Sequence, residues 1–542
     1  MAVVVICQLV GSSAPEFVHT TGSLLTDKPK TTADIQVLAR QRGIPGVATA
    51  FHEWIGDRAN SATRKYPVFI VAAQGGGQYA AYHTALSLAR LYDVCPKLRN
   101  HVFAISSVSG GSFGAAMFTE LLRQKGTLDD RCSTKVVAPG PLETSVRDFF
   151  SSDFVTPVLA TGLLFDLPTL LIPQLRLLPD RARTLELAYH QAISPKSETT
   201  ETQFYSTWSP SGTAPALFFN STSANYGRPV IVSQLYMADQ RPVQLLEQLV
   251  AQSMRLFGRR FSTKEEQERA DRFRLLIIDG IQANTYTRPN YFNILEYRPD
   301  LQMSRATASV LSARFPYVTP PGLLHSDKVY AAADTTLRET TDLQLIDGGF
   351  WDNSGISTAI GIMRQLRSAN ETKELAGNLE FHLISFGHAR SALQMEGSRD
   401  AQSELFAPIT TFEAVRESRR FRSTDAEAAG FQAVHSYELF DHQFQAPLSW
   451  TLSSRIRREI EARSGGEVAP SLCCALPEVP IFASMLPDFT LNLEPMKQYL
   501  APGYLSKPEK DGFRLVTPNL RAFRAIIWLV QQTSQNATPT AK

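Results

Sequence analysis

The sequence predicts an α/β protein with a mainly parallel central sheet, and three observations support this class. Two β-rich runs, YPVFIVAA (66–73) and HVFAIS (101–106), each lead into glycines and then into a stretch with helical spacing of apolar residues. A further apolar run, LEFHLISFG (379–387), is typical of a buried strand. Successive strand–turn–helix units make neighbouring strands parallel, with both turns at the sheet end where open α/β sheets bind ligands.

The elements follow in chain order from their patterns. Helices are expected at 79–93 and 113–126, the second ending at Gly126, and strands at 215–223 and at the start of 343–355. The charged stretch 263–274 predicts a solvated helix face, and the last 150 residues look helical and loop-rich. The expected domains are an N-terminal arm (1–65), a main domain (66–390) with a large insertion at about 130–340, a helical C-terminal extension (391–530) and a disordered tail (531–542).

Composition limits the possible function classes. The 542 residues are 43% hydrophobic and 20% charged, which is ordinary for a globular protein. A formal net charge of +2 gives no general attraction to nucleic acid. The five cysteines are sparse and form no C-x-x-C pair, and the adjacent Cys473 and Cys474 are poorly placed for a disulfide or for zinc, so we expect free, mostly structural thiols in a reducing compartment.

Membrane-spanning segments are not expected in this chain. The N-terminal run MAVVVICQLVG is shorter than the about 20 residues that a span needs, and it lacks the basic region of a signal peptide. The run LLFDLPTLLIPQLRLLP is interrupted by Asp166, Arg176 and three prolines. We therefore expect a cytoplasmic or peripherally membrane-associated protein. The N-terminal run is expected to be a buried strand or an arm, with the end of a truncated membrane segment as the alternative.

Small residues surround Ser109 where the second strand meets its helix. A serine nucleophile needs an exposed hydroxyl, and a sharp strand-to-helix turn exposes it at the cost of crowding its neighbours. The G-x-S-x-G elbow relieves this crowding with small residues two positions before and after the serine. Here Ser107 and Gly111 occupy those positions, and the N-terminus of the following helix favours developing negative charge.

Two more glycine-rich turns fit the same chemistry. The loop AAQGGGQYAA offers the unobstructed backbone amides of Gly75, Gly76 and Gly77 at a strand end, which suits an oxyanion. A nucleotide phosphate loop is disfavoured, because no G-K-[ST] follows and the G-x-G-x-x-G spacing is absent. In IDGGFWDNSG, Asp347 ends an apolar strand before Gly348 and Gly349, where its carboxylate could accept the serine proton.

The order glycine loop, serine elbow and Asp-Gly-Gly resembles the patatin-like phospholipases, in particular their larger bacterial members. The resemblance extends over about 66–460, with blocks such as SARFPYVTPPG and FNSTSANYG. It implies an αβα sandwich, a Ser109–Asp347 dyad, and an oxyanion hole from Gly75, Gly76, Gly77 and Gly110. The implied activity is hydrolysis of phospholipid or other acyl-ester lipid, without metal or cofactor. The chain departs from the family at Tyr79, where Arg or Lys is usual.

Two alternative functions fit the same residues. The first is an α/β-hydrolase-type esterase with a Ser109–Asp347–His388 triad, in the chain order which that fold uses. The second is a catalytically silent scaffold that binds lipid or a protein partner. His83 and His101 are expected to be structural or surface residues. A lipid acyl chain would need an apolar groove, for which 155–178 is a candidate, although ordinary core is the simpler interpretation of that region.

Overall fold

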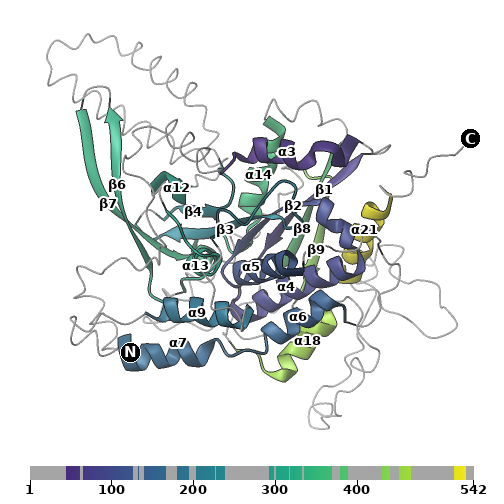
Figure 1. Ribbon diagram of the computed structural model, residues 1–542, viewed down its shortest axis with the longest axis horizontal. Helices are drawn as coiled ribbons and strands as arrows, with labels where there is room; N and C mark the ends of the chain where they lie inside the picture. The colour runs from purple at the N-terminus through teal and green to yellow at the C-terminus, as the bar shows by residue number, and fades with distance from the viewer. Residues whose placement is uncertain are drawn as a thin grey trace, which may run out of the picture.

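The computed structural model describes residues 44–60, 65–125, 132, 139–166, 180–193, 203–225, 227–237, 292–297, 301–315, 318–332, 335–368, 379–387, 430–439, 451–464 and 518–532. Within these residues, nine strands form one sheet with helices on both sides (Figure 1). The predicted α/β class with a mainly parallel central sheet is confirmed.

The sheet is built around β1 (Tyr66–Ala73), whose eight residues are all buried. β1 pairs in parallel with β2 (Val102–Val108) on one side and with β8 (Leu379–Gly387) on the other. β3 (Ala216–Ser223) continues the parallel set beyond β2, and β9 (Ala433–Glu438) continues it beyond β8. Continuous apolar runs such as YPVFIVAA suit this arrangement, because the strands of a parallel sheet are covered on both faces.

Antiparallel strands complete one side of the sheet. β4 (Pro229–Ser233) pairs antiparallel with β3, and β5 (Phe292–Asn293) extends the sheet beyond β4. β6 (Gly322–Ala332) and β7 (Thr335–Asp347) form a long hairpin that projects away from the sheet (Figure 1). Only the end of β7 joins the sheet, where it pairs with β3.

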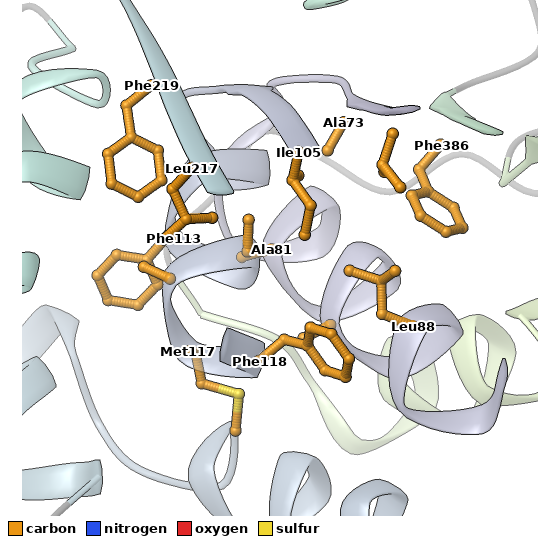
Figure 2. Packing of buried hydrophobic residues seen from close by; sticks show 14 of the residues in the cluster. Ala73, Ala81, Leu88, Ile105, Phe113, Met117, Phe118, Leu217, Phe219 and Phe386 are labelled. Carbon is orange, nitrogen blue, oxygen red and sulfur yellow. The ribbon is translucent and has the colours of Figure 1, made fainter. Parts of the chain in front are cut away.

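The two faces of the sheet pack against different helices, because successive strand residues point in opposite directions. Phe69, Val71 and Ala73 of β1 face a cluster that includes α4 (Gly77–Val94) and α5 (Gly110–Lys125). Val68, Ile70 and Ala72 face the cluster of α3 (Val47–Asn60) and α14 (Ile356–Ser368). In Figure 2, Phe118 of α5 lies below Ile105 of β2, and Phe113 of α5 lies below Leu217 of β3. The result is a three-layered αβα sandwich.

Further helices cover the α4–α5 side. They are α6 (Pro141–Phe149), α7 (Val155–Thr161), η2 (Gly162–Asp166), α9 (Arg181–Ile193), α12 (Ile294–Tyr297), α13 (Arg305–Leu311), α18 (Ser454–Ser464) and α21 (Pro518–Gln532). Two short turns complete the set: η1 (Pro96–Asn100) connects α4 to β2, and η4 (Gly348–Phe350) directly follows β7. Among these, α18 and α21 come from the C-terminal region that was expected to be helical. α18 is tied to α4 by the hydroxyl of Tyr82, which donates to Glu461 at 2.6 Å.

The structure differs from the sequence-based expectation at the cysteines. Cys95, which caps the C-terminus of α4, forms a disulfide with Cys132, 37 residues further along the chain. The expectation of free thiols is therefore wrong for this pair, because the fold brings together two cysteines whose spacing matches no short motif. Disulfides persist in oxidising compartments, so this pair does not support a reducing one. Cys7, Cys473 and Cys474 lie outside the described residues.

The structure also differs from the sequence-based expectations in three segments: the N-terminal arm, the C-terminal extension and the region 155–178. The helix α3 lies in a region expected to be an irregular arm, and β9 is a strand in a region expected to be helical and loop-rich. In the described part of 155–178, Leu159, Leu163 and Leu164 are exposed rather than core residues. The predicted helix at 263–274, the N-terminal run 1–11 and residues 533–542 of the expected tail lie outside the described residues, whereas 531–532 are the last residues of α21.

Candidate active site

Ser109 occupies a sharp turn between β2 and α5. Its φ of 49° is left-handed, and Ser109 is the one non-glycine residue with a positive φ in the described part of the chain. This conformation costs a residue with a side chain about 1–2 kcal/mol. Backbone hydrogen bonds hold it, since the Ser109 carbonyl accepts from the N–H groups of Ser112 at 3.0 Å and Phe113 at 3.2 Å. Strain of this kind at a strand-to-helix turn is typical of a nucleophile elbow.

Close packing explains the two glycines after Ser109. A Cβ on Gly110 would overlap the Gly77 carbonyl oxygen, and a Cβ on Gly111 would lie 2.6 Å from the carbonyl oxygens of both Ala73 and Gln74. The start of α5 therefore lies directly against the end of β1 and the start of α4. Ser107, which stands for the first glycine of the elbow pattern, is fully buried in β2 and pairs with Ala73.

β2 and β7 meet head-on along one edge of β3. β2 runs parallel to β3 and ends with Val108 opposite Asn220. β7 runs antiparallel to β3 and ends with Asp347 opposite the next residue, Ser221. Because β4 occupies the other edge of β3 over these residues, β2 and β7 share the same edge. Successive residues of a strand rise by about 3.3 Å, so the ends of β2 and β7 are immediate neighbours.

Side-chain packing agrees with this register. A Cβ on Gly348, the residue after Asp347, would lie 3.2 Å from the Cγ1 of Val108, the residue before Ser109. The same Cβ would overlap the carbonyl oxygen of Asn220. Only a glycine leaves room for this approach, so the Asp-Gly-Gly sequence lets the Asp347 loop lie against the end of β2.

Asp347 is buried, with 1% of its surface exposed. Its Oδ1 accepts a hydrogen bond from the Gly349 N–H at 2.7 Å, which fixes the orientation of the carboxylate. Its own backbone N–H donates to the carbonyl of Arg314 at 3.0 Å. The carboxylate is thus held by a turn of its own loop, beside the elbow that carries Ser109.

The glycine loop approaches the same place from the end of β1. An ideal Cβ on Gly75 would lie 3.0 Å from the Cβ of Ser109, so the two residues are in contact. The Gly75 N–H, however, donates to the carbonyl of Asn353 at 2.9 Å. This amide is engaged in holding the loop, which differs from the expectation that all three glycine amides face an oxyanion.

Gly77 and Gly110 are the first residues of α4 and α5. N–H groups at helix N-termini have no acceptor within their own helix, and the helix dipole makes such positions favourable for negative charge. A Cβ on Gly110 would be 2.9 Å from the Gly77 nitrogen, so the two helix N-termini touch beside Ser109. Gly76 precedes α4 as its N-cap. Gly76, Gly77 and Gly110 thus bring the N-termini of two helices together beside Ser109.

Tyr79 lies over the glycine loop. Its Cζ and hydroxyl oxygen would each be 2.5 Å from a Cβ on Gly76, and the side chain is almost fully buried. The phenol therefore covers Gly76 from the first turn of α4, at the position where the resemblance implies a cation. An uncharged hydroxyl stands there in place of a positive charge.

Two asparagines of the site were missed by sequence reasoning. Asn353 holds the glycine loop and the base loop together, because its carbonyl accepts from Gly75 and its Oδ1 lies against both Gly75 and Gly349. Asn220 uses its Nδ2 to hold the Ser107 carbonyl at 2.8 Å. Both lie in stretches that the sequence analysis singles out without assigning these asparagines a role: Asn353 in IDGGFWDNSG and Asn220 in FNSTSANYG.

The histidines have separate positions. His83 is buried in α4, where its Nδ1 contacts the Ser464 hydroxyl at 2.9 Å and burial lowers its pKa to about 4. His101 is buried before β2, and its Nδ1 lies 2.9 Å from the Pro67 carbonyl. Both histidines are buried residues with structural contacts, and neither is the surface residue that was the other expectation. His388, the third member of the alternative triad, lies outside the described residues.

The described residues hold no group of three or more His, Cys, Asp or Glu side chains that could bind a metal ion. None of the helices in this part of the chain combines the length and the apolar character that a membrane span requires.

Known proteins resemble this chain only weakly, in sequence and in structure. No protein-family model matches the sequence, and no curated protein matches it either. Among solved structures, VipD from Legionella pneumophila has a TM-score of 0.23 at 9% identity, covering 74% of this chain and 66% of that one. Human GIVD cytosolic phospholipase A2 has a TM-score of 0.27 at 14% identity, covering 71% of this chain and 53% of that one. The chain thus spans just under two thirds and about half of their lengths, and TM-scores at this level carry no argument about function.

Proposed function

We propose that this chain is a lipid acyl hydrolase that cleaves carboxylic ester bonds of phospholipids or related lipids through a Ser109–Asp347 dyad. The observation that carries the proposal is the head-on meeting of β2 and β7 on one edge of β3, which joins the strained serine turn to the buried carboxylate. The glycine loop and two helix N-termini adjoin the same turn. A nucleophile, a base and oxyanion donors are the set that ester hydrolysis requires.

The proposed reaction proceeds in two steps. Asp347 accepts the hydroxyl proton of Ser109 as its Oγ attacks the ester carbonyl, and the tetrahedral oxyanion forms beside the amides of Gly76, Gly77 and Gly110. One such donor is typically worth about 3–4 kcal/mol of transition-state stabilisation. The alcohol then leaves with the proton from Asp347, and an acyl group remains on Ser109. In the second step Asp347 takes a proton from water, which attacks the acyl carbonyl. The fatty acid then leaves as Asp347 returns this proton to the Ser109 Oγ, so that both groups are restored.

Apolar side chains on the surface support a lipid as the substrate. Five large side chains are exposed on one group of helices: Leu159 of α7, Leu163, Leu164 and Phe165 of η2, and Leu187 of α9. On its inner side α9 reaches the site region, because Tyr189 packs against Phe113, one turn beyond Ser109, with ring centroids 4.5 Å apart. We propose that this apolar surface contacts the lipid aggregate, as a peripheral membrane protein would.

The test measures hydrolysis of p-nitrophenyl acyl esters and of phospholipid vesicles by the wild type, Ser109→Ala and Asp347→Asn. The control is Ser309→Ala, because Ser309 is buried and its hydroxyl donates to Ala306 within its own helix. We expect activity in the wild type and the control, and a loss of more than about 10³-fold in the other two. Equal background from all four proteins would instead favour a catalytically silent lipid-binding scaffold.

A further inference from the structure

Ser312 contacts both loops of the candidate site. It is fully buried and follows directly on α13 as its C-cap. Its Oγ accepts a hydrogen bond from the backbone N–H of Ser109 at 3.0 Å. Its carbonyl accepts one from the N–H of Gly348, the neighbour of Asp347, at 3.1 Å. One residue therefore holds the nucleophile turn with its side chain and the base loop with its backbone.

The hydrogen-bonding capacity of the Ser312 hydroxyl is fully used. Its single proton goes to the Asn220 carbonyl, 2.5 Å away, because a carbonyl can only accept. Its two lone pairs then face the Ser109 N–H and the hydroxyl of Ser112, which donates at 2.9 Å. A hydroxyl with one donor and two acceptor contacts has a single orientation, so its position is determined by its surroundings.

The segment that carries Ser312 is anchored on several sides. The carbonyl of Arg314 accepts the N–H of Asp347, and the carbonyl of Leu311 accepts the hydroxyl of Ser221 at 2.9 Å. The guanidinium of Arg314 lies 3.6 Å from the carboxylate of Glu186, and both side chains are fully buried. Residues 311–314 thus form a rigid support against which both loops are placed.

We propose that Ser312 is a positioning residue that fixes the Ser109 turn relative to the Asp347 loop. The inference rests on the proposed function, because it assigns Ser312 a role in the reaction of that dyad. The physical reason lies in the left-handed backbone of Ser109, whose cost must be met by contacts that exist only in this conformation. The bond to Ser312 Oγ is one of these contacts, and without it the direction of the Ser109 side chain is less defined.

Two substitutions remove the contact in different ways. Ser312→Ala deletes the hydroxyl and leaves the Ser109 N–H and the Asn220 carbonyl without this partner. Ser312→Cys keeps a side chain of similar size but offers only weak hydrogen bonding, and it serves the test if the alanine variant does not fold. Ser309→Ala is the matched control, because it removes a buried hydroxyl three residues earlier that contacts neither loop. Thermal midpoints of all three establish that they are folded.

The test combines hydrogen exchange with steady-state kinetics, and hydrogen exchange can be measured even if the protein has no activity. Hydrogen exchange followed by mass spectrometry should be faster in Ser312→Ala and Ser312→Cys for a peptide covering 107–112, whose Ser109 N–H loses its acceptor, and unchanged there in Ser309→Ala. The peptide 346–350 should change less, because the Gly348 N–H keeps the backbone carbonyl of residue 312 as its acceptor. With p-nitrophenyl butyrate, kcat should fall by about 10- to 100-fold at a nearly constant KM, because misplacement by about 1 Å acts on the chemical step.

The outcomes separate this inference from the proposed function. Unchanged exchange at 107–112 overturns the role of Ser312, and so does an unchanged kcat in an active protein. An inactive wild type contradicts the proposed function and the reaction role of Ser312 together, and the exchange data then show whether Ser312 still orders the Ser109 turn.

Discussion

Val108 and Asp347 end two strands that meet along a single edge of β3, the first opposite Asn220 and the second opposite Ser221. The residue after Val108 is Ser109, in a left-handed turn, and the residue after Asp347 is a glycine packed against Val108. This junction brings a hydroxyl and a carboxylate together from positions that lie far apart in the sequence. The five predictions that follow test its packing, its strain, its chemistry and the fold that carries it.

Gly110 should not tolerate a side chain. In Gly110→Ala the new Cβ would overlap the Gly77 carbonyl, a backbone atom that cannot move without shifting the start of α4. We expect a loss of unfolding free energy of about 1–3 kcal/mol, measured by urea denaturation. Gly46→Ala is the control, because its nearest neighbour would be the Tyr236 carbonyl at 3.9 Å. Equal denaturation midpoints for the two variants would contradict the packing described here.

The backbone strain at Ser109 should be measurable by comparing two inactive variants. Ser109→Ala keeps a Cβ in the left-handed conformation, whereas Ser109→Gly removes it. Removing the Cβ should relieve about 1–2 kcal/mol of backbone strain. Glycine also makes the unfolded chain more flexible, which lowers the unfolding free energy by about 0.5–1 kcal/mol. The net result should be a glycine variant that is more stable than the alanine variant by about 0.5–1 kcal/mol. Urea denaturation of both checks this. The account is wrong on this point if the alanine variant is at least as stable.

His388 distinguishes a dyad from a triad. In the proposed dyad Asp347 is the base, so His388→Ala should keep kcat within about twofold of the wild type. In a Ser–His–Asp triad the same substitution would remove the base and lower kcat by more than about 10³-fold. Steady-state kinetics with a soluble p-nitrophenyl ester makes the distinction, and His190→Ala, which changes a partly exposed histidine of α9, is the control.

The stability of the fold should depend on pH through His101. Burial lowers the pKa of His101 to about 3, below the ordinary value of 6.5, although its bond to the Pro67 carbonyl opposes this shift. The unfolded chain therefore binds a proton that the folded chain does not, and the contribution to stability is present above pH 6.5 and lost as the pH falls towards 3.

The variant His101→Asn keeps a polar side chain but cannot titrate. Between pH 7 and pH 5, the wild type should lose about 2 kcal/mol more unfolding free energy than this variant. Urea denaturation at the two pH values checks the difference, with His52→Asn as a control because His52 is exposed on α3. Parallel losses in wild type and His101→Asn would show that His101 does not contribute to the pH dependence.

Local sequence patterns predicted the centre of the fold well. β1 and β8 have the predicted bounds, and α4, β2 and α5 begin or end within a few residues of them, because each is a continuous apolar or periodic run. Of the β6–β7 hairpin, the sequence predicted only the last part of β7, where the residues are apolar. Most other residues of the hairpin are polar, and they show only a weak alternation of apolar and polar side chains. β9 was missed because it is short and borders the sheet on one side only.

The candidate site was predictable in its residues but not in its support. Ser109 and Asp347 stand in glycine-rich turns that show in the sequence. That β2 and β7 share one edge of β3 is a long-range pairing, which no local pattern encodes. Ser312 reaches Ser109 from 203 residues away, and its neighbours in the sequence give no sign of that contact. The engagement of the Gly75 amide by Asn353 likewise appears only in three dimensions.

Covalent labelling of the nucleophile is the most direct test of the central claim. A fluorophosphonate, which transfers its phosphonyl group to an activated serine with loss of fluoride, is incubated with the wild type, Ser109→Ala and Asp347→Asn, and the products are read by mass spectrometry. We predict one adduct, on the peptide that contains Ser109, absent from Ser109→Ala and formed far more slowly by Asp347→Asn. No adduct in the folded wild type, or one located on another serine, would contradict the account.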